Sequence, residues 1–126
     1  MNFDFNLVVN SFPLLLLGAG VTLQISLLSV GFGFFIGMFV GMARLSKIWA
    51  VKTLSLIYVD FIRGTPLLVQ IFIIYFALPI VAGQRIDPFV AAITACSINS
   101  GAYVAEIFRA GIQSIDRGQM EAGRSL

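Results

Sequence analysis

Charged side chains inside apolar stretches offer this chain its most evident chemistry, and Arg63 is the first of them. It lies in the hexapeptide FIRGTP at residues 61–66, between the apolar runs LSLIYVD and LLVQIFIIYF. An ionisable group in such a setting is a candidate functional group, because hydrocarbon solvates charge poorly. The planar guanidinium has the fork geometry that pairs with a carboxylate. Arg63 is therefore predicted to bind an anionic group or to gate its passage.

Two structural roles for Arg63 stay open from the sequence alone. Its guanidinium could form an ion pair with Asp60, one turn earlier, or with Glu106 on another helix. Its side chain could also reach the cytoplasmic surface, if the apolar span around it begins later than expected.

A second polar set lies in the apolar stretch that follows Pro88. At helical spacing, one face would carry Ala92, Cys96, Asn99, Tyr103 and Glu106. A helix that faces lipid would not carry Asn, Tyr and Glu in one row, so this face should look into a bundle or a water-filled path. Hydrogen bonding between helices by Asn99 and Ser100, without any ligand, explains the pattern equally well.

Several kinds of chemistry are excluded by what the sequence lacks. There is no histidine, which excludes Ser–His or Cys–His nucleophilic catalysis and histidine-based metal sites. The single cysteine, Cys96, cannot form an internal disulfide. No GxxxxGK[ST] phosphate loop occurs, and a net charge of +2 is too small to indicate nucleic-acid binding. The chain is predicted not to be an enzyme, with no catalytic or metal-binding residue.

The composition is that of an integral membrane protein. Hydrophobic residues make up 59% of the chain and charged residues 11%, whereas soluble domains are about half apolar and about a quarter charged. Three stretches carry no charged side chain: 5–43, 64–84 and 88–105. Each can hold most or all of the roughly 20 residues that a helix needs to cross the hydrocarbon layer. The predicted fold class is all-α, with three transmembrane helices in a single domain over 1–126.

The expected order of segments follows from the charges. We expect an extracytoplasmic lead-in at 1–15, spans at 16–43, 53–79 and 88–108, loops at 44–52 and 80–87, and a tail at 109–126. Basic residues follow the first span (Arg44, Lys47, Lys52) and the third (Arg109, Arg117, Arg124), whereas the loop between the second and third spans has only Arg85. The positive-inside rule then places the N-terminus outside and the tail in the cytoplasm. Asp87 and Pro88 are expected to open the third helix, with the carboxylate as its cap.

The second span is predicted to be interrupted near Gly64–Pro66. Proline has no N–H and disfavours helical geometry at the residue before it. Thr65 is expected to cap a new half-helix that begins at Pro66 and ends near Leu78. This half would be only about 20 Å long, so the break would lie well inside the bilayer. Unsatisfied N–H groups at the break and the charge of Arg63 would together attract an anion.

A packing seam is predicted in the first span. Gly33, Gly37 and Gly41 recur at four-residue spacing, so they lie on one face of a helix. Small residues in such a row let a second helix approach closely in lipid.

Three longer motifs carry a resemblance to a known family. RGTPLLVQIFIIYF, NSGAYVAEIFRAGIQSI and GQMEAGRSL together resemble the membrane permease subunit of binding-protein-dependent ABC importers for polar amino acids of the histidine, glutamine and arginine type. The resemblance covers essentially the whole chain. EAGRSL is similar to the start of the EAA motif, which in that family forms a coupling helix on a cytoplasmic ATPase. The residues carried over to this role are Gln119, Met120, Glu121, Ala122 and Gly123. Gly123 replaces the usual second alanine at a cost of roughly 1 kcal/mol in helix propensity, which need not change the role.

The resemblance implies a partner set and a location. It implies two permease subunits, identical or different, two ABC ATPase subunits that bind ATP and Mg²⁺, an extracytoplasmic solute-binding protein, and the lipid of a bacterial inner membrane. No cofactor is expected in this chain. The family normally has about five spans, so this chain is expected to be a C-terminally shortened piece of a subunit.

If the chain belongs to such an importer, the positions of its polar residues predict roles for them in amino-acid transport. Arg63, with Gly64, Thr65 and Pro66, is expected to receive the substrate carboxylate. Asn99, Ser100 and Tyr103 would line the path, and Glu106 would contact the substrate amine or balance the charge of Arg63. Which amino acid is carried is not predicted.

Three other readings stay open. The chain could belong to a permease for another small solute, to a channel or ion-coupled carrier that uses Arg63 and Glu106 as gating charges, or to a scaffold that does not transport. The EAA-like tail favours the importer, because a channel, an ion-coupled carrier and a scaffold do not need it.

Overall fold

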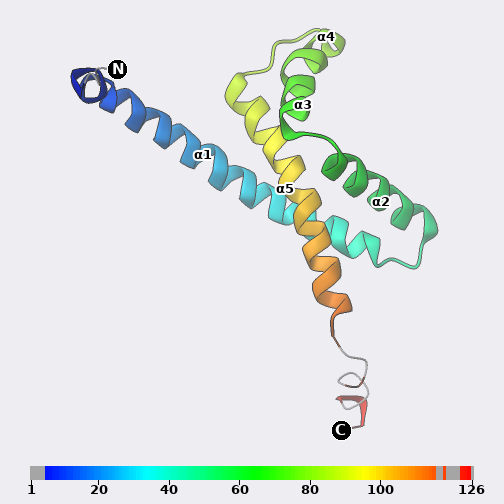
Figure 1. Cartoon of the computed structure of the whole chain (residues 1–126). Helices are drawn as coiled ribbons and strands as arrows, with labels where there is room; N and C mark the ends of the chain where they lie inside the picture. The colour runs from blue at the N-terminus through cyan, green and yellow to red at the C-terminus, as the bar shows by residue number, and fades with distance from the viewer. Residues whose placement is uncertain (1–4, 116–117, 119–122, 126) are drawn as a thin grey trace.

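The computed structural model describes residues 5–115, 118 and 123–125, and this part of the chain is all-helical, as predicted. The elements are α1 Phe5–Arg44, α2 Trp49–Gly64, α3 Leu67–Phe72, the π-helical stretch η1 Ile73–Ala77, α4 Leu78–Ala82 and α5 Pro88–Gln113. Figure 1 shows that α1 and α5 cross, while α2, α3 and α4 all lie on one side of α5. The contact between α1 and α5 is therefore the centre of the fold.

Helix α1 is longer than the first expected span. Its 40 residues extend about 60 Å, twice the thickness of the hydrocarbon core. Residues 5–15, expected as a separate lead-in, form its first turns. Figure 1 shows these turns end-on whereas the rest of α1 runs across the view, so the helix bends near its start. Pro13 lies inside this region and accounts for the bend, because it removes one helical hydrogen bond.

Helices α1 and α5 run in the same direction. The facing pairs advance together along both helices: Gly33 with Ser100, Gly37 with Val104, and Gly41 with Phe108. The chain that joins their ends must therefore return to the side on which α1 began. Within the described residues, two helices are long and apolar enough to span a membrane, and a third span is present if α2 and the α3–α4 segment count as one broken span.

The start of α5 is as predicted. The Asp87 carboxylate accepts hydrogen bonds from the N–H groups of Phe89, at 2.9 Å, and Val90, at 3.2 Å. Pro88 occupies the first helical position, where no N–H partner is needed. The preceding helix, α4, ends at Gly83, whose φ of 69° is the left-handed conformation that glycine adopts without strain. Gly83 and Asp87–Pro88 thus fix the two ends of the loop between α4 and α5.

The widened turn η1 precedes Pro79. The N–H of Leu78 donates to the carbonyl of Ile73, five residues earlier, instead of four. A proline ring clashes with the carbonyl four residues before it in a regular helix, and a π-helical turn relieves such a clash. The second half of the broken span is therefore continuous from Leu67 to Ala82 in spite of its proline.

Candidate functional site

The predicted interruption of the second span is confirmed. Helix α2 ends at Gly64 and α3 begins at Leu67, and the axis of the Leu67–Ala82 segment differs in direction from that of α2 by 105°. Thr65 between them is extended, with φ −113° and ψ 142°. Because Pro66 has no N–H, the carbonyl of Ile62 lacks the donor that a continuous helix would supply.

The prediction that Thr65 caps the new half-helix was wrong. Its hydroxyl donates backwards, to the carbonyl of Phe61 at 3.0 Å, and the capping position of α3 is Pro66, without a side-chain cap. A threonine hydroxyl readily bonds the carbonyl four residues earlier. That carbonyl is available here because the chain leaves the helix at Thr65.

Gln70, which the sequence analysis did not select, links the two sides of the break through its side-chain amide. Its side-chain nitrogen donates to the carbonyls of Ile62, at 2.8 Å, and Thr65, at 3.1 Å. The residue is only 6% exposed, so its amide substitutes for the donors that the break removed. Asn99 of α5 donates in turn to the Gln70 side-chain oxygen, at 3.2 Å. The signal in the sequence was that Gln70 is the only polar side chain between Thr65 and Tyr75.

Replacing Gln70 by leucine is expected to lower the free energy of unfolding by about 2 kcal/mol, because it leaves buried carbonyls without donors. Unfolding by sodium dodecyl sulfate in bicelles would measure this. The matched control is Leu68→Met, which changes an exposed side chain of the same helix. Equal stability of Gln70→Leu and the parent chain would show that other donors serve these carbonyls.

The break lies beside the middle of α5 (Pro88–Gln113). Asn99, which bonds Gln70, is about 16 Å along α5 from Pro88, at 1.5 Å per residue. The hydrocarbon core of a bilayer is about 30 Å thick. The polar groups of the break are therefore level with the centre of α5, where unpaired polar groups are most costly.

Arg63 extends from the last turn of α2 toward α5. Its guanidinium carbon lies 5.3 Å from the centre of the Tyr103 ring, a cation–π distance. One guanidinium nitrogen lies 4.0 Å from a carboxylate oxygen of Glu106. Among the described residues its ion pair is with Glu106 and not with Asp60. The side chain is 41% exposed, so it is accessible along this face.

Glu106 lies among three arginines. Arg44, at the end of α1, pairs with one carboxylate oxygen, and Arg109 pairs with the other through two nitrogens, with its Nε at 3.0 Å. Arg63 is the third and the most loosely held. This group, which we call the arginine cluster, consists of Arg44, Arg63, Glu106 and Arg109. It carries two positive charges in excess and joins the ends of α1 and α5.

The other predicted path residues divide between two faces of α5. Asn99, Tyr103 and Glu106 form one polar line that meets Gln70 and Arg63. Ser100 instead lies against α1, where a Cβ atom on Gly33 would come within 2.6 Å of it. The reason is the turn of about 100° per helical residue, which moves Ser100 off the line of Asn99.

The three glycines of α1 lie at the contact with α5. A Cβ atom at Gly37 would be 2.5 Å from the Val104 Cβ and 2.8 Å from the Gly101 carbonyl oxygen. At Gly41 it would be 2.9 Å from the Phe108 Cβ. On the opposite helix, Gly101 leaves room for Ile36 of α1 and for the hydroxyl of Tyr58. The helices therefore approach more closely than any side chain at these positions would allow.

The remaining predicted positions have fewer neighbours. Gly64 is exposed, and no atom lies within 4 Å of where its Cβ would be. Pro66 is exposed at the turn itself. The coupling residues Gln119, Met120, Glu121 and Ala122 lie outside the described residues, whereas Gly123 is described and exposed.

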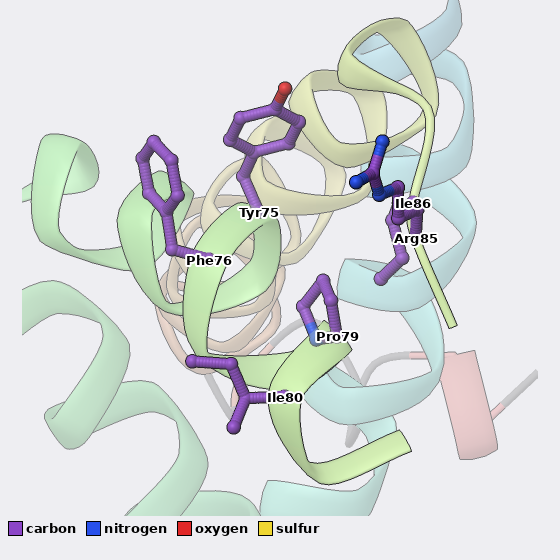
Figure 2. A pocket seen from close by; sticks show the side chains of 6 residues that line it. All are labelled: Tyr75, Phe76, Pro79, Ile80, Arg85 and Ile86. Atoms are coloured by element: carbon purple, nitrogen blue, oxygen red, sulfur yellow. The ribbon is translucent and has the colours of Figure 1, made fainter. Parts of the chain in front are cut away.

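An open hollow of about 420 Å³ lies at the other end of the molecule from the arginine cluster. Its lining consists of Tyr75, Phe76, Pro79, Ile80, Arg85 and Ile86. Figure 2 shows Tyr75 and Arg85 on opposite sides of it, the first from η1 and the second from the loop before α5, with Pro79 between them. The two polar groups of this hollow are thus at the start of α5, and the arginine cluster is near its end.

With the geometry described, similarity to known proteins decides the family. Residues 33–126 match the family of binding-protein-dependent transport system inner membrane components. The chain belongs to this family. It is 46% identical over 127 residues to the glutamine transport system permease protein GlnP of Escherichia coli (strain K12), covering 100% of this chain and 58% of that protein. It is 41% identical to the arginine transport system permease protein ArtQ of Bacillus subtilis (strain 168), again covering 100% of this chain and 58% of that protein.

A solved structure extends the family assignment to the fold. The chain in the crystal structure of an amino acid ABC transporter with histidines matches this one with a TM-score of 0.91 and 44% identity, over 99% of this chain and 58% of that one. The chain thus spans a little over half the length of the permeases it matches. Its helices have the ABC permease fold, and membership of a membrane transport family agrees with its apolar spans.

Proposed function

We propose that this chain forms part of the translocation path of an ATP-driven amino-acid importer in the bacterial inner membrane. The observation that carries the proposal is the position of Arg63, which lies at the end of α2 beside the break and is accessible along the polar face of α5. Relatives named for glutamine and arginine transport support an amino acid as the solute. The N-terminus lies outside and the tail in the cytoplasm.

The polar face would act on the two charged ends of a free amino acid. Arg63 binds the carboxylate, because its guanidinium offers several N–H donors and, among the described residues, contacts only the Tyr103 ring and a distant Glu106. The turn made by Gly64, Thr65 and Pro66 sets the position of Arg63. Asn99 and Tyr103 line the path, and the excess positive charge of the arginine cluster attracts an anionic group. The hollow between Tyr75 and Arg85 is the outer opening of this path.

Membership of the family supports the following partners. Two cytoplasmic ABC ATPase subunits, with ATP and Mg²⁺, supply the energy. A second permease subunit completes the path, and an extracytoplasmic binding protein delivers the amino acid. The tail, with Gln119, Met120, Glu121, Ala122 and Gly123, couples to the ATPase, and the chain itself carries out no hydrolysis.

A channel or ion-coupled carrier is the second candidate, favoured by the paired Arg63 and Glu106. Uptake by the complete transporter in proteoliposomes separates the two. We expect uptake of labelled glutamine or arginine with ATP and the binding protein present, and a loss of at least about tenfold when ATP is replaced by ADP. Uptake that continues without ATP hydrolysis, in the presence of an ion gradient, would instead support the carrier.

A further inference from the structure

The arginine cluster shares one carboxylate among three guanidinium groups, and the sharing is uneven. One Glu106 oxygen, Oε1, accepts two contacts from Arg109. The other, Oε2, accepts from Arg44 and lies 4.0 Å from Arg63. A nitrogen–oxygen separation of 4.0 Å is too long for a hydrogen bond. Arg63 is thus the one guanidinium of the three that does not donate to Glu106.

Arg63, which does not donate to Glu106, is also the most exposed of the three arginines. The side chain of Arg44 is 10% exposed and that of Arg109 30%, whereas that of Arg63 is 41% exposed. Arg44 comes from the end of α1, which the glycine contacts hold against α5. Arg109 lies three residues after Glu106 on the same helix. The positions of Arg44 and Arg109 beside Glu106 are therefore fixed, the first by the packing of α1 on α5 and the second by the helix that it shares with Glu106. Arg63 reaches Glu106 from a different helix, α2.

From this geometry we propose that Glu106 competes with the substrate carboxylate for Arg63 and does not contact the substrate amine. Its ion pairs with Arg44 and Arg109 reduce this competition without abolishing it. The inference rests on the proposed function, in which Arg63 binds the substrate carboxylate. While Arg44 and Arg109 engage both oxygens of Glu106, the donors of Arg63 stay available for that carboxylate. Arg44 and Arg109 are then positioning residues that set the affinity of Arg63 without touching the substrate.

Electrostatics argue against the alternative role, in which Glu106 binds the substrate amine. The charged groups that face Glu106 are Arg44 from α1, Arg63 from α2 and Arg109 from its own helix. Their summed charge exceeds that of the carboxylate by two units. An ammonium group brought to Glu106 would meet more repulsion than attraction, whereas a carboxylate brought to Arg63 would be attracted by the whole cluster.

The test is the sign of the change in KM for uptake by the complete transporter in proteoliposomes, with labelled glutamine and arginine as probes. Glu106→Gln removes the competitor and is expected to lower KM about three- to tenfold with little change in maximal rate. Arg44→Gln frees one oxygen of Glu106 to bind Arg63 and is expected to raise KM about tenfold. The double variant Arg44→Gln, Glu106→Gln is expected to return KM to the parent value or below. Lys52→Gln, which removes an exposed cation from α2, is the charge control.

Each outcome decides the inference. A raised or unchanged KM in Glu106→Gln overturns it, and a raised KM would assign the substrate amine to Glu106. A raised KM in Arg44→Gln that Glu106→Gln does not reverse also overturns it. If Arg44→Gln does not assemble, Arg109→Gln makes the same test, because Arg109 holds the other oxygen. Failure of the proposed function is distinguished by the parent transporter, which would then show no ATP-driven uptake of either probe.

Discussion

Arg63→Ala is expected to raise the KM for uptake by the complete transporter about 30-fold, with assembly unchanged. This equals about 2 kcal/mol, the lower end of the range for removing one partner of a desolvated charge pair. The lower end applies because the side chain is 41% exposed. Arg63→Lys is expected to recover only part of the loss, because an ammonium keeps the charge but not the planar fork.

Two measurements separate binding from structure in this experiment. Size-exclusion chromatography of the assembled complex and its thermal unfolding report whether Arg63→Ala folds. Arg63 contacts Tyr103 and lies 4.0 Å from Glu106 on an accessible face, so its loss should cost little stability. Lys52→Ala is the matched control, since Lys52 is an exposed cation on the same helix. Normal uptake by Arg63→Ala in an intact complex would remove Arg63 from the substrate site.

The elements that the sequence predicted correctly depend on short-range physics. Charge-free stretches mark the spans because charge is excluded from hydrocarbon at any position. The break follows from Gly64 and Pro66 alone, and the start of α5 from Asp87 and Pro88 alone. In each of these cases the signal lies in the same segment as its structural effect, so no knowledge of the fold was needed.

The features that were not predicted depend on how the helices pack. Gln70 reaches the carbonyl of Ile62 only because the Leu67–Ala82 segment turns by 105° from α2 and brings its first turns back over the end of α2. Arg44 meets Glu106 across 62 residues of sequence, through the crossing of α1 and α5. The sequence marked Arg44 only as a basic residue after the first span. The sharing of Glu106 among three arginines could therefore be seen only in the structure.

The neighbours of the polar residues of α5 could not be predicted from the pattern either. Asn99 and Ser100 are adjacent and of similar polarity, and both were expected to line the path. The structure puts Asn99 against Gln70 and Ser100 against Gly33. Which of two adjacent polar residues faces a neighbouring helix depends on the rotation of α5, which is set by the glycine contacts of α1.

Those glycine contacts give the second large expected effect. Gly37→Leu is expected to destabilise the packing of α1 on α5 by about 3 kcal/mol or more, at the upper end for inserting a side chain into a packed contact. Even its Cβ would lie 2.8 Å from the Gly101 carbonyl oxygen, which is backbone and cannot rotate away. The change should lower the yield of assembled permease and the denaturant concentration at which it unfolds in bicelles.

Gly31→Leu is the matched control, because it makes the same substitution six residues earlier in α1, where no atom lies within 4 Å of the Cβ position. It should leave stability near that of the parent, or slightly raise it, since leucine favours the helix more than glycine does. Loss of packing at Gly37 would also move Arg44 away from Glu106, because the end of α1 carries Arg44. Among the molecules that still assemble, KM should therefore rise as it does for Arg44→Gln. Equal stability of the Gly37 and Gly31 variants would contradict the close approach of α1 and α5, and with it the geometry that leaves Arg63 free for a substrate.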